Sequence, residues 1–166
     1  MPIPQNYLRQ IAQRNDISFS IKAAERNPLY KIFLCHSHKD KELVEGLFKD
    51  FKRLGIFLYV DWLDPLLPST PDQKTAEAIQ RNIKEAKRFF FLATEHSKAS
   101  VWCPWEIGYA DALGKEIVII PTYNDISDAC FGNEYLHLYP HIDIVSKNSK
   151  VSYIMIGPNI PWGKNL

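Results

Sequence analysis

The chain has 166 residues, of which 46% are hydrophobic and 23% are charged, and its formal net charge is +1. This length and composition are typical of one globular domain that needs neither disulfides nor a metal to bury a core. A charge so close to zero argues against binding to nucleic acid or to an anionic membrane surface, because both interactions need a concentrated positive field.

The cysteines and the apolar segments favour a reduced, cytoplasmic protein. Cys35, Cys103 and Cys130 are odd in number and form no CxxC pair, which argues against a disulfide framework and a structural zinc site. The opening residues, MPIPQNYLRQIAQRND, contain no apolar run suited to a signal peptide, and no stretch of about 18 apolar residues is present to span a bilayer. We therefore expect a cytoplasmic protein without a membrane partner.

Residues 1–29 are predicted to form an N-terminal extension to a main domain over residues 30–166. Apolar residues are sparse in the extension, and Tyr7, Leu8 and Ile11 are compatible with a short helix. We expect this segment to form a helical or extended arm that packs on the domain or on a partner.

The main domain begins with a predicted strand and helix. The apolar run YKIFLC at residues 30–35 predicts a buried strand. The segment KELVEGLFKDFKRLG has one apolar helical face and ends at Gly55, a residue type favoured just after a helix. Ser37, followed three residues later by Asp40, resembles a capping box at the start of this helix.

A second strand and helix follow, separated by a long loop. IFLYVDW at residues 56–62 predicts a strand, and Pro65 and Pro68 exclude regular structure from the loop after it. Thr70, Pro71 and Gln73 are residue types favoured at a helix N-terminus, and apolar residues then recur at helical spacing.

The order of the remaining elements indicates the fold class. RFFFLAT and EIVIIP predict a third and a fourth strand, and WCPWEIGYADALG predicts a short helix between them. Alternating strands and helices are typical of an α/β fold in which helices cover both faces of a central parallel sheet, as in flavodoxin-like proteins. After residue 121, the apolar pieces HIDIV and SYIMI favour a hairpin over a helix.

Ligands bind at the carboxyl ends of the strands in open parallel sheets, so the loops after Cys35, Tyr59 and Ala93 are of most interest. The first loop holds two histidines beside a cysteine but has no second ligand pair at a zinc-finger spacing, and we expect no metal site. His36 and Ser37 are candidates for contact with a ribose or a phosphate of a substrate. The alternative is that Ser37 caps the following helix and His36 is solvated.

The segment SKASVWCPWEIGYADAL contains the most informative carboxylate. Pro104 is tolerated only in a first helical turn, so the helix begins close to Ser100, its expected N-cap. Glu106 shares a stripe with Trp102 and Tyr109, and a lone carboxylate in an aromatic stripe is unusual because a buried unpaired charge is costly. Either Glu106 is functional, or it lies in the first turn and complements the positive helix end by about 0.3–1 kcal/mol.

Three segments, in the same order along the chain, resemble the TIR (Toll/interleukin-1 receptor) family of the bacterial, enzymatic type. KIFLCHSHKD is similar to the family's first strand and its following loop, and YVDWLDPLLPSTPDQKTAEAIQRNI to the second strand, the BB loop and the second helix. SKASVWCPWEIGYADALGKEIVIIP is similar to the third-helix region, including the spacing from Trp102 to Glu106. The resemblance covers about residues 30–121 and implies the flavodoxin-like three-layer TIR fold.

The resemblance further implies cleavage of the nicotinamide–ribose bond of NAD+, which is then a substrate, with no cofactor required. Glu106 corresponds to the family's catalytic glutamate, and a fixed carboxylate suits an oxocarbenium-like transition state. Trp102 is a candidate to stack on the cationic nicotinamide ring, or else packs in the core. In the BB loop, Trp62 and Leu63 are candidates for substrate contact, with core packing as the alternative for Leu63.

Three functions remain open at this point, and the first two come from different classes. The first is an NADase that makes ADP-ribose or a cyclic derivative as a signal, similar to the TIR component of Thoeris antiphage systems, whose product activates a separate effector. The second is a non-catalytic scaffold that acts through TIR–TIR assembly, and a nucleoside-processing transferase is a weaker third. The chain has no GxGxxG, Walker or GxSxG motif, so a Rossmann dehydrogenase, a P-loop enzyme and a hydrolase triad are not supported.

Overall fold

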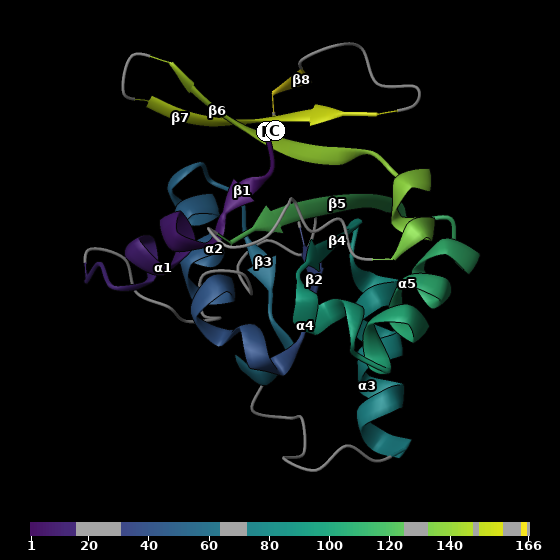
Figure 1. Ribbon diagram of the computed structural model, residues 1–166. Coiled ribbons are helices and arrows are strands. Elements are labelled where there is room, and N and C mark those ends of the chain that lie inside the picture. Colours follow the sequence, from purple (N-terminus) through teal and green to yellow (C-terminus); the bar gives the residue numbers. More distant parts are fainter. Residues whose placement is uncertain (16–30, 64–72, 125–132, 148–149, 158–163, 166) are drawn as a thin grey trace.

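The computed structural model describes residues 1–15, 31–63, 73–124, 133–147, 150–157 and 164–165 (Figure 1). Within these ranges the strands form one mixed sheet in the order β3-β2-β4-β5-β6-β7-β8, and β1 pairs with β5 beside β6. The strands are β1 Ile3–Pro4, β2 Ile32–Cys35, β3 Leu58–Tyr59, β4 Arg88–Ala93, β5 Glu116–Tyr123, β6 His141–Lys147, β7 Lys150–Ile156 and β8 Lys164–Asn165. The pairs from β3 through to β6 are parallel, and the pairs β6–β7 and β7–β8 are antiparallel.

Helices cover both faces of the sheet, which confirms the predicted three-layer α/β fold (Figure 1). They are α1 Gln5–Ala12, α2 Lys41–Arg53, α3 Gln73–Glu85, α4 Glu95–Lys98 and α5 Trp102–Ala112. Alternate residues of one strand point to opposite layers. In β4, Phe90 and Leu92 join the core under α1 and α2, whereas Phe89 and Phe91 join the core under α3 and α5.

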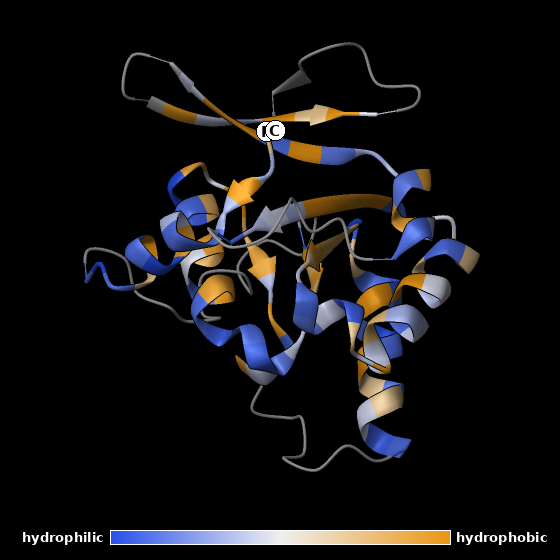
Figure 2. Cartoon of the chain, viewed as in Figure 1, coloured by the Kyte–Doolittle hydropathy of each residue, from blue (hydrophilic) through white to orange (hydrophobic). Residues whose placement is uncertain are grey.

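Burial on both faces explains why the strands are continuous apolar runs rather than alternating ones. Figure 2 shows the hydrophobic colours concentrated on the strands of the sheet and the hydrophilic colours on the outer helices. Among the helices that the structure describes, none is both long enough and apolar enough to cross a bilayer.

The parallel strands β2 to β6 follow the flavodoxin-like order 2-1-3-4-5 when they are counted along the chain. The chain leaves β2 toward one edge, to form β3, and then returns past β2 to form β4. The strand order therefore reverses between β2 and β4. In sheets of this topology, ligands bind outside the carboxyl ends of the strands at such a switch point.

The C-terminal segment forms the predicted hairpin. β6 and β7 pair in antiparallel register from His141 opposite Ile156 to Lys147 opposite Lys150. Tyr153 and Met155 of β7 are buried in the core under α1 and α2, so the hairpin belongs to the sheet. In the described part of the chain, no α-helix follows this hairpin.

The N-terminal residues are joined to the domain by a strand and a helix. Ile3 pairs with Thr122 of β5, and α1 packs on α2 with Leu8 fully buried. The Lys49 ammonium donates to the carbonyl oxygens of Ala12 and Arg14, at 2.5 and 2.9 Å. The predicted short helix is confirmed, while residues 16–30 lie outside the described part and the boundary at residue 29 stays a prediction.

Two local expectations were wrong. The strand expected over residues 56–62 is only two residues long, because the Asp61 carboxylate accepts the Trp62 backbone N–H at 2.7 Å and turns the chain into a 3-10 turn. The capping box expected from Ser37 and Asp40 does not form, since Asp40 instead contacts Thr94 and His96. Ser37 alone caps the short 3-10 turn before α2, by accepting the Lys39 backbone N–H at 3.4 Å.

Candidate active site

Helix α5 presents Glu106 to the interior of the domain. The Ser100 hydroxyl accepts the backbone N–H groups of Trp102 and Cys103 at 3.2 and 3.3 Å, as a capping side chain does, but Val101 and not Ser100 occupies the N-cap position. Pro104 then lies in the first turn, where its missing N–H has no partner to lose. Glu106 is the fifth residue of the helix and only 5% exposed, so it is not a solvent-facing charge at the helix end.

The surroundings of Glu106 disfavour its ionised form. Burial raises the pKa of Glu106 well above its usual range, and the negative charges of Cys103 and Asp61 raise it further. The neighbouring Cys35 side chain opposes this shift without cancelling it. The free site therefore holds a carboxyl group whose ionisation is costly until a positive charge arrives.

We expect Glu106→Gln to raise the melting temperature near neutral pH by about 2–4 °C, which corresponds to about 1 kcal/mol in a chain of this size. A pKa that is higher in the folded state than in the unfolded one gives stability that is present at low pH and lost as the pH rises through the folded pKa. Glutamine stays neutral, so its advantage should grow with pH and vanish below about pH 4. Thermal unfolding of the parent and of Glu106→Gln, from below about pH 4 to neutral pH, measures this difference in melting temperature. A variant that melts lower than the parent at every pH would contradict this account.

A second cluster joins the carboxyl ends of β2 and β3. His36 Nε2 lies 3.2 Å from Asp61 Oδ1, and His38 Nε2 lies 3.2 Å from Asp61 Oδ2. The His36 contact has an ion-pair distance but not the angle of a hydrogen bond. The edge of the Trp62 ring meets the His36 ring, with centroids 4.4 Å apart. The sheet thus brings together the sequence-predicted residues His36 and Trp62.

Asp61 is the charged centre of this cluster. Burial alone would raise the pKa of Asp61, but its contacts with His36 and His38 outweigh burial and hold that pKa far below its usual range. The hydrogen bond with Asp61 raises the pKa of His38 in turn. Sequence reasoning missed Asp61. The available signal was an acidic residue directly after an apolar strand, at the edge where ligands bind.

The other predicted contact residues differ in their surroundings. Trp102 is half-buried and meets Trp105 edge-on, with ring centroids 5.5 Å apart. Leu63 is half-buried against the α2 side of the core, as its alternative role predicted. Ser37 is buried and caps a turn. The substrate contacts assigned to these residues, to His36 and to Trp62 stay predictions.

Two thiols lie beside Glu106. Cys35 and Cys103 are buried and free, and the Cys35 thiol donates to the Cys103 carbonyl oxygen at 4.0 Å. The adjacent Cys35 side chain lowers the pKa of Cys103 to about 7, although burial opposes the shift. In the described ranges, no group of three or more His, Cys, Asp or Glu side chains has the arrangement of a metal site. Cys130 lies outside those ranges.

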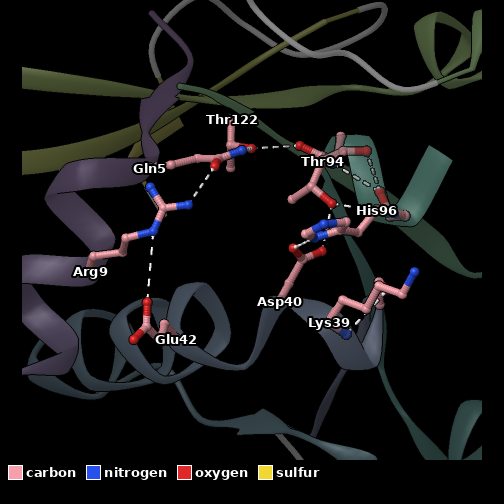
Figure 3. A network of polar contacts seen from close by, with 11 residues as sticks. Gln5, Arg9, Lys39, Asp40, Glu42, Thr94, His96 and Thr122 are labelled. Atoms are coloured by element: carbon pink, nitrogen blue, oxygen red, sulfur yellow. Dashed lines mark hydrogen bonds and ion pairs between the residues drawn. The ribbon is translucent and has the colours of Figure 1, made fainter. Parts of the chain in front are cut away.

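A third polar cluster links the ends of β2 and β4 (Figure 3). The Thr94 hydroxyl donates to Asp40 Oδ2 and His96 Nδ1 meets Asp40 Oδ1, each at 2.6 Å. Thr94 also forms a true capping box with Ser97 at the start of α4. Sequence analysis did not single out His96, because the contact joins residues 56 positions apart.

Known proteins similar in sequence to this chain show its family. A family model of the TIR domain matches residues 32–152. The chain is 34% identical over 134 residues to a protein of Bacillus cereus (strain MSX-D12) named "Probable 3′ cyclic ADP-D-ribose synthase ThsB′", with 79% of this chain and 69% of that protein covered. It is 26% identical over 130 residues to a Cytobacillus dafuensis protein named "Putative cyclic ADP-D-ribose synthase TIR2", and the match covers 76% of this chain but only 32% of that protein. The chain belongs to the TIR-domain family.

Proposed function

We propose that this chain cleaves the nicotinamide–ribose bond of NAD+ and converts the remainder into a cyclic ADP-ribose, with linear ADP-ribose as the hydrolytic product. The observation that carries the proposal is Glu106, a buried carboxyl group with a raised pKa at the carboxyl edge of the sheet. Perturbed acids of this kind are typical of functional sites. The names of the two relatives support the same substrate and product class.

The chemistry follows from charge. The nicotinamide ring of NAD+ is positive, so its arrival beside Glu106 supplies the counter-charge that favours the carboxylate. When the glycosidic bond breaks, nicotinamide leaves as a neutral molecule with the bonding electrons, and the positive charge moves to the ribose. The Glu106 carboxylate then stabilises an oxocarbenium-like transition state. No general acid is needed for such a leaving group.

The remaining predicted residues fit around this centre. Trp102 stacks on the nicotinamide ring, His36 and Ser37 contact the ribose or phosphates, and Trp62 with Leu63 borders the substrate from the BB loop. NAD+ is a substrate in this scheme and no cofactor takes part. We further propose a cytoplasmic role in antiphage signalling, with self-assembly of TIR domains to complete the site and a separate effector that responds to the product.

We expect mass spectrometry to find nicotinamide and either cyclic or linear ADP-ribose after concentrated protein is incubated with NAD+. Cleavage at the glycosidic bond yields these products, whereas cleavage of the diphosphate yields nicotinamide mononucleotide and AMP. Finding the second pair would reject the proposed chemistry while leaving an NAD-degrading enzyme.

A further inference from the structure

The cluster of Asp40, Thr94 and His96 lies at the switch point of the sheet. Asp40 follows β2, and Thr94 and His96 follow β4, the two strands between which the strand order reverses. This is where flavodoxin-like sheets bind their ligands. The Asp61 cluster lies one strand away, between β2 and β3, and Asp40 is near enough to Cys103 to influence the pKa of that thiol. All of these groups therefore share one edge.

Asp40 orients the His96 ring. The Asp40 side chain is 2% exposed, and the Thr94 hydroxyl fixes its second oxygen. Because a carboxylate can only accept a hydrogen bond, Nδ1 of His96 carries a hydrogen, and in the neutral ring Nε2 therefore holds the lone pair. The His96 side chain is 51% exposed, and Nε2 has no hydrogen-bond or ion-pair partner among the described residues. An imidazole held in this way is arranged as a proton acceptor.

The proposed reaction needs a proton acceptor that Glu106 does not provide. The 3′ position in the name of the Bacillus cereus relative points to ring closure through a ribose hydroxyl. After nicotinamide has left with its electron pair, the oxygen of that hydroxyl forms a new bond to the ribose C1, and the hydroxyl must lose its proton. In the proposed scheme the Glu106 carboxylate keeps its negative charge beside the oxocarbenium-like ribose until the new bond to C1 has formed, so it does not take up that proton in the same step. We infer that His96, oriented by Asp40, accepts the proton of the hydroxyl in the adenosine half of the substrate that closes the ring. The imidazolium then returns the proton to water.

The placement of the two groups fits a ring closure between the ends of one molecule. Glu106 projects from α5 and contacts groups at β2, whereas His96 projects from α4 on the β4 side of the switch point. The adenosine half lies at the opposite end of the substrate from the nicotinamide ribose. The base that accepts the proton of its hydroxyl is therefore expected at a different position from Glu106. This inference rests on the proposed NAD+ cleavage.

The test compares nicotinamide release with the ratio of cyclic to linear product. We expect His96→Ala to lower the yield of cyclic product at least about tenfold, a modest share of what general base catalysis contributes. Nicotinamide release should fall less, because bond breaking does not need this proton transfer. Free imidazole should restore the cyclic product, since the side chain occupies an exposed position that a small base can enter.

His141→Ala is the matched control. His141 also pairs with an aspartate, Asp143, at 3.7 Å, but it is the first residue of β6 and lies beside Ile119 within β5. We expect its product ratio to equal that of the parent. Asp40→Asn should shift the ratio in the same direction as His96→Ala, because an amide can donate to Nδ1 and reverse the tautomer.

The outcomes separate this inference from the proposed function. A parent that releases no nicotinamide at any concentration overturns both. A parent that releases nicotinamide but makes only linear ADP-ribose overturns the inference alone. So does an unchanged product ratio in His96→Ala, or a changed ratio that imidazole does not restore, because the latter indicates a structural role.

Discussion

Replacing Glu106 with glutamine should lower kcat/KM for nicotinamide release at least about 100-fold, the scale of losing one electrostatic contact to a transition state. Glutamine has the shape of glutamate but no charge to stabilise the oxocarbenium-like ribose. The stability of the fold should not fall, because the buried carboxyl group is itself unfavourable when ionised. Chromatographic measurement of nicotinamide, with melting curves of both proteins, separates lost chemistry from lost folding.

Glu116→Gln provides the control for this substitution. Glu116 is the first residue of β5, at the amino edge of the sheet and therefore opposite the candidate site, and it pairs with Arg88 at 2.8 Å. Its side chain is 46% exposed. We expect this variant to keep the parent rate, and equal losses in the two variants would argue against a special role for Glu106.

Gly46→Ala should destabilise the fold by about 2–3 kcal/mol, in the range of overpacked cores. Gly46 lies in α2 where α1 crosses it, and a Cβ atom there would come within 2.0 Å of the Leu8 carbonyl oxygen. That oxygen belongs to the helix backbone, so relief requires α1 to move away from α2. A buried contact between the N-terminal helix and the core would be lost, and urea or thermal unfolding measures the effect.

Gly108→Ala is the matched comparison within another helix. A Cβ atom at Gly108 of α5 would have no neighbour within 4 Å. Alanine is favoured over glycine in a helix by about 1 kcal/mol, so this variant should be as stable as the parent or more stable. If both glycine variants unfold at the same denaturant concentration, the close approach of α1 and α2 is not the cause.

Periodicity in the sequence was enough to predict the layers of the fold. The apolar runs that became β2, β4 and β5 are buried on both faces, and the spacing of apolar residues in α2 matches its buried face. Both signals are local, since they depend on the repeat of a strand or a helix. The short length of β3 escaped prediction because a side chain, Asp61, competes with the strand for the Trp62 N–H.

The candidate site was predictable only in part. Glu106 stood out as a lone carboxylate in an aromatic stripe, and its burial supports that reasoning. Asp61 and the pair of Asp40 and His96 did not stand out, because their partners are far away along the chain. Ser37 is a residue type that often caps helices, and it caps the 3-10 turn before α2. This role was predictable because its partner, the Lys39 backbone N–H, is only two residues away. Pairings between strand ends require the strand order, and no local pattern predicts that order.

The most direct test of the central claim is nicotinamide release from NAD+ by the unmodified protein, measured over a wide range of protein concentration beside Glu106→Gln. We predict release by the parent, with a rate per chain that rises with concentration if assembly completes the site, and loss of nearly all release in the variant. Absence of release from the folded parent at every concentration would contradict the account and favour a scaffold that acts through TIR–TIR assembly. Equal release by both proteins would leave an NADase whose catalytic carboxylate is not Glu106.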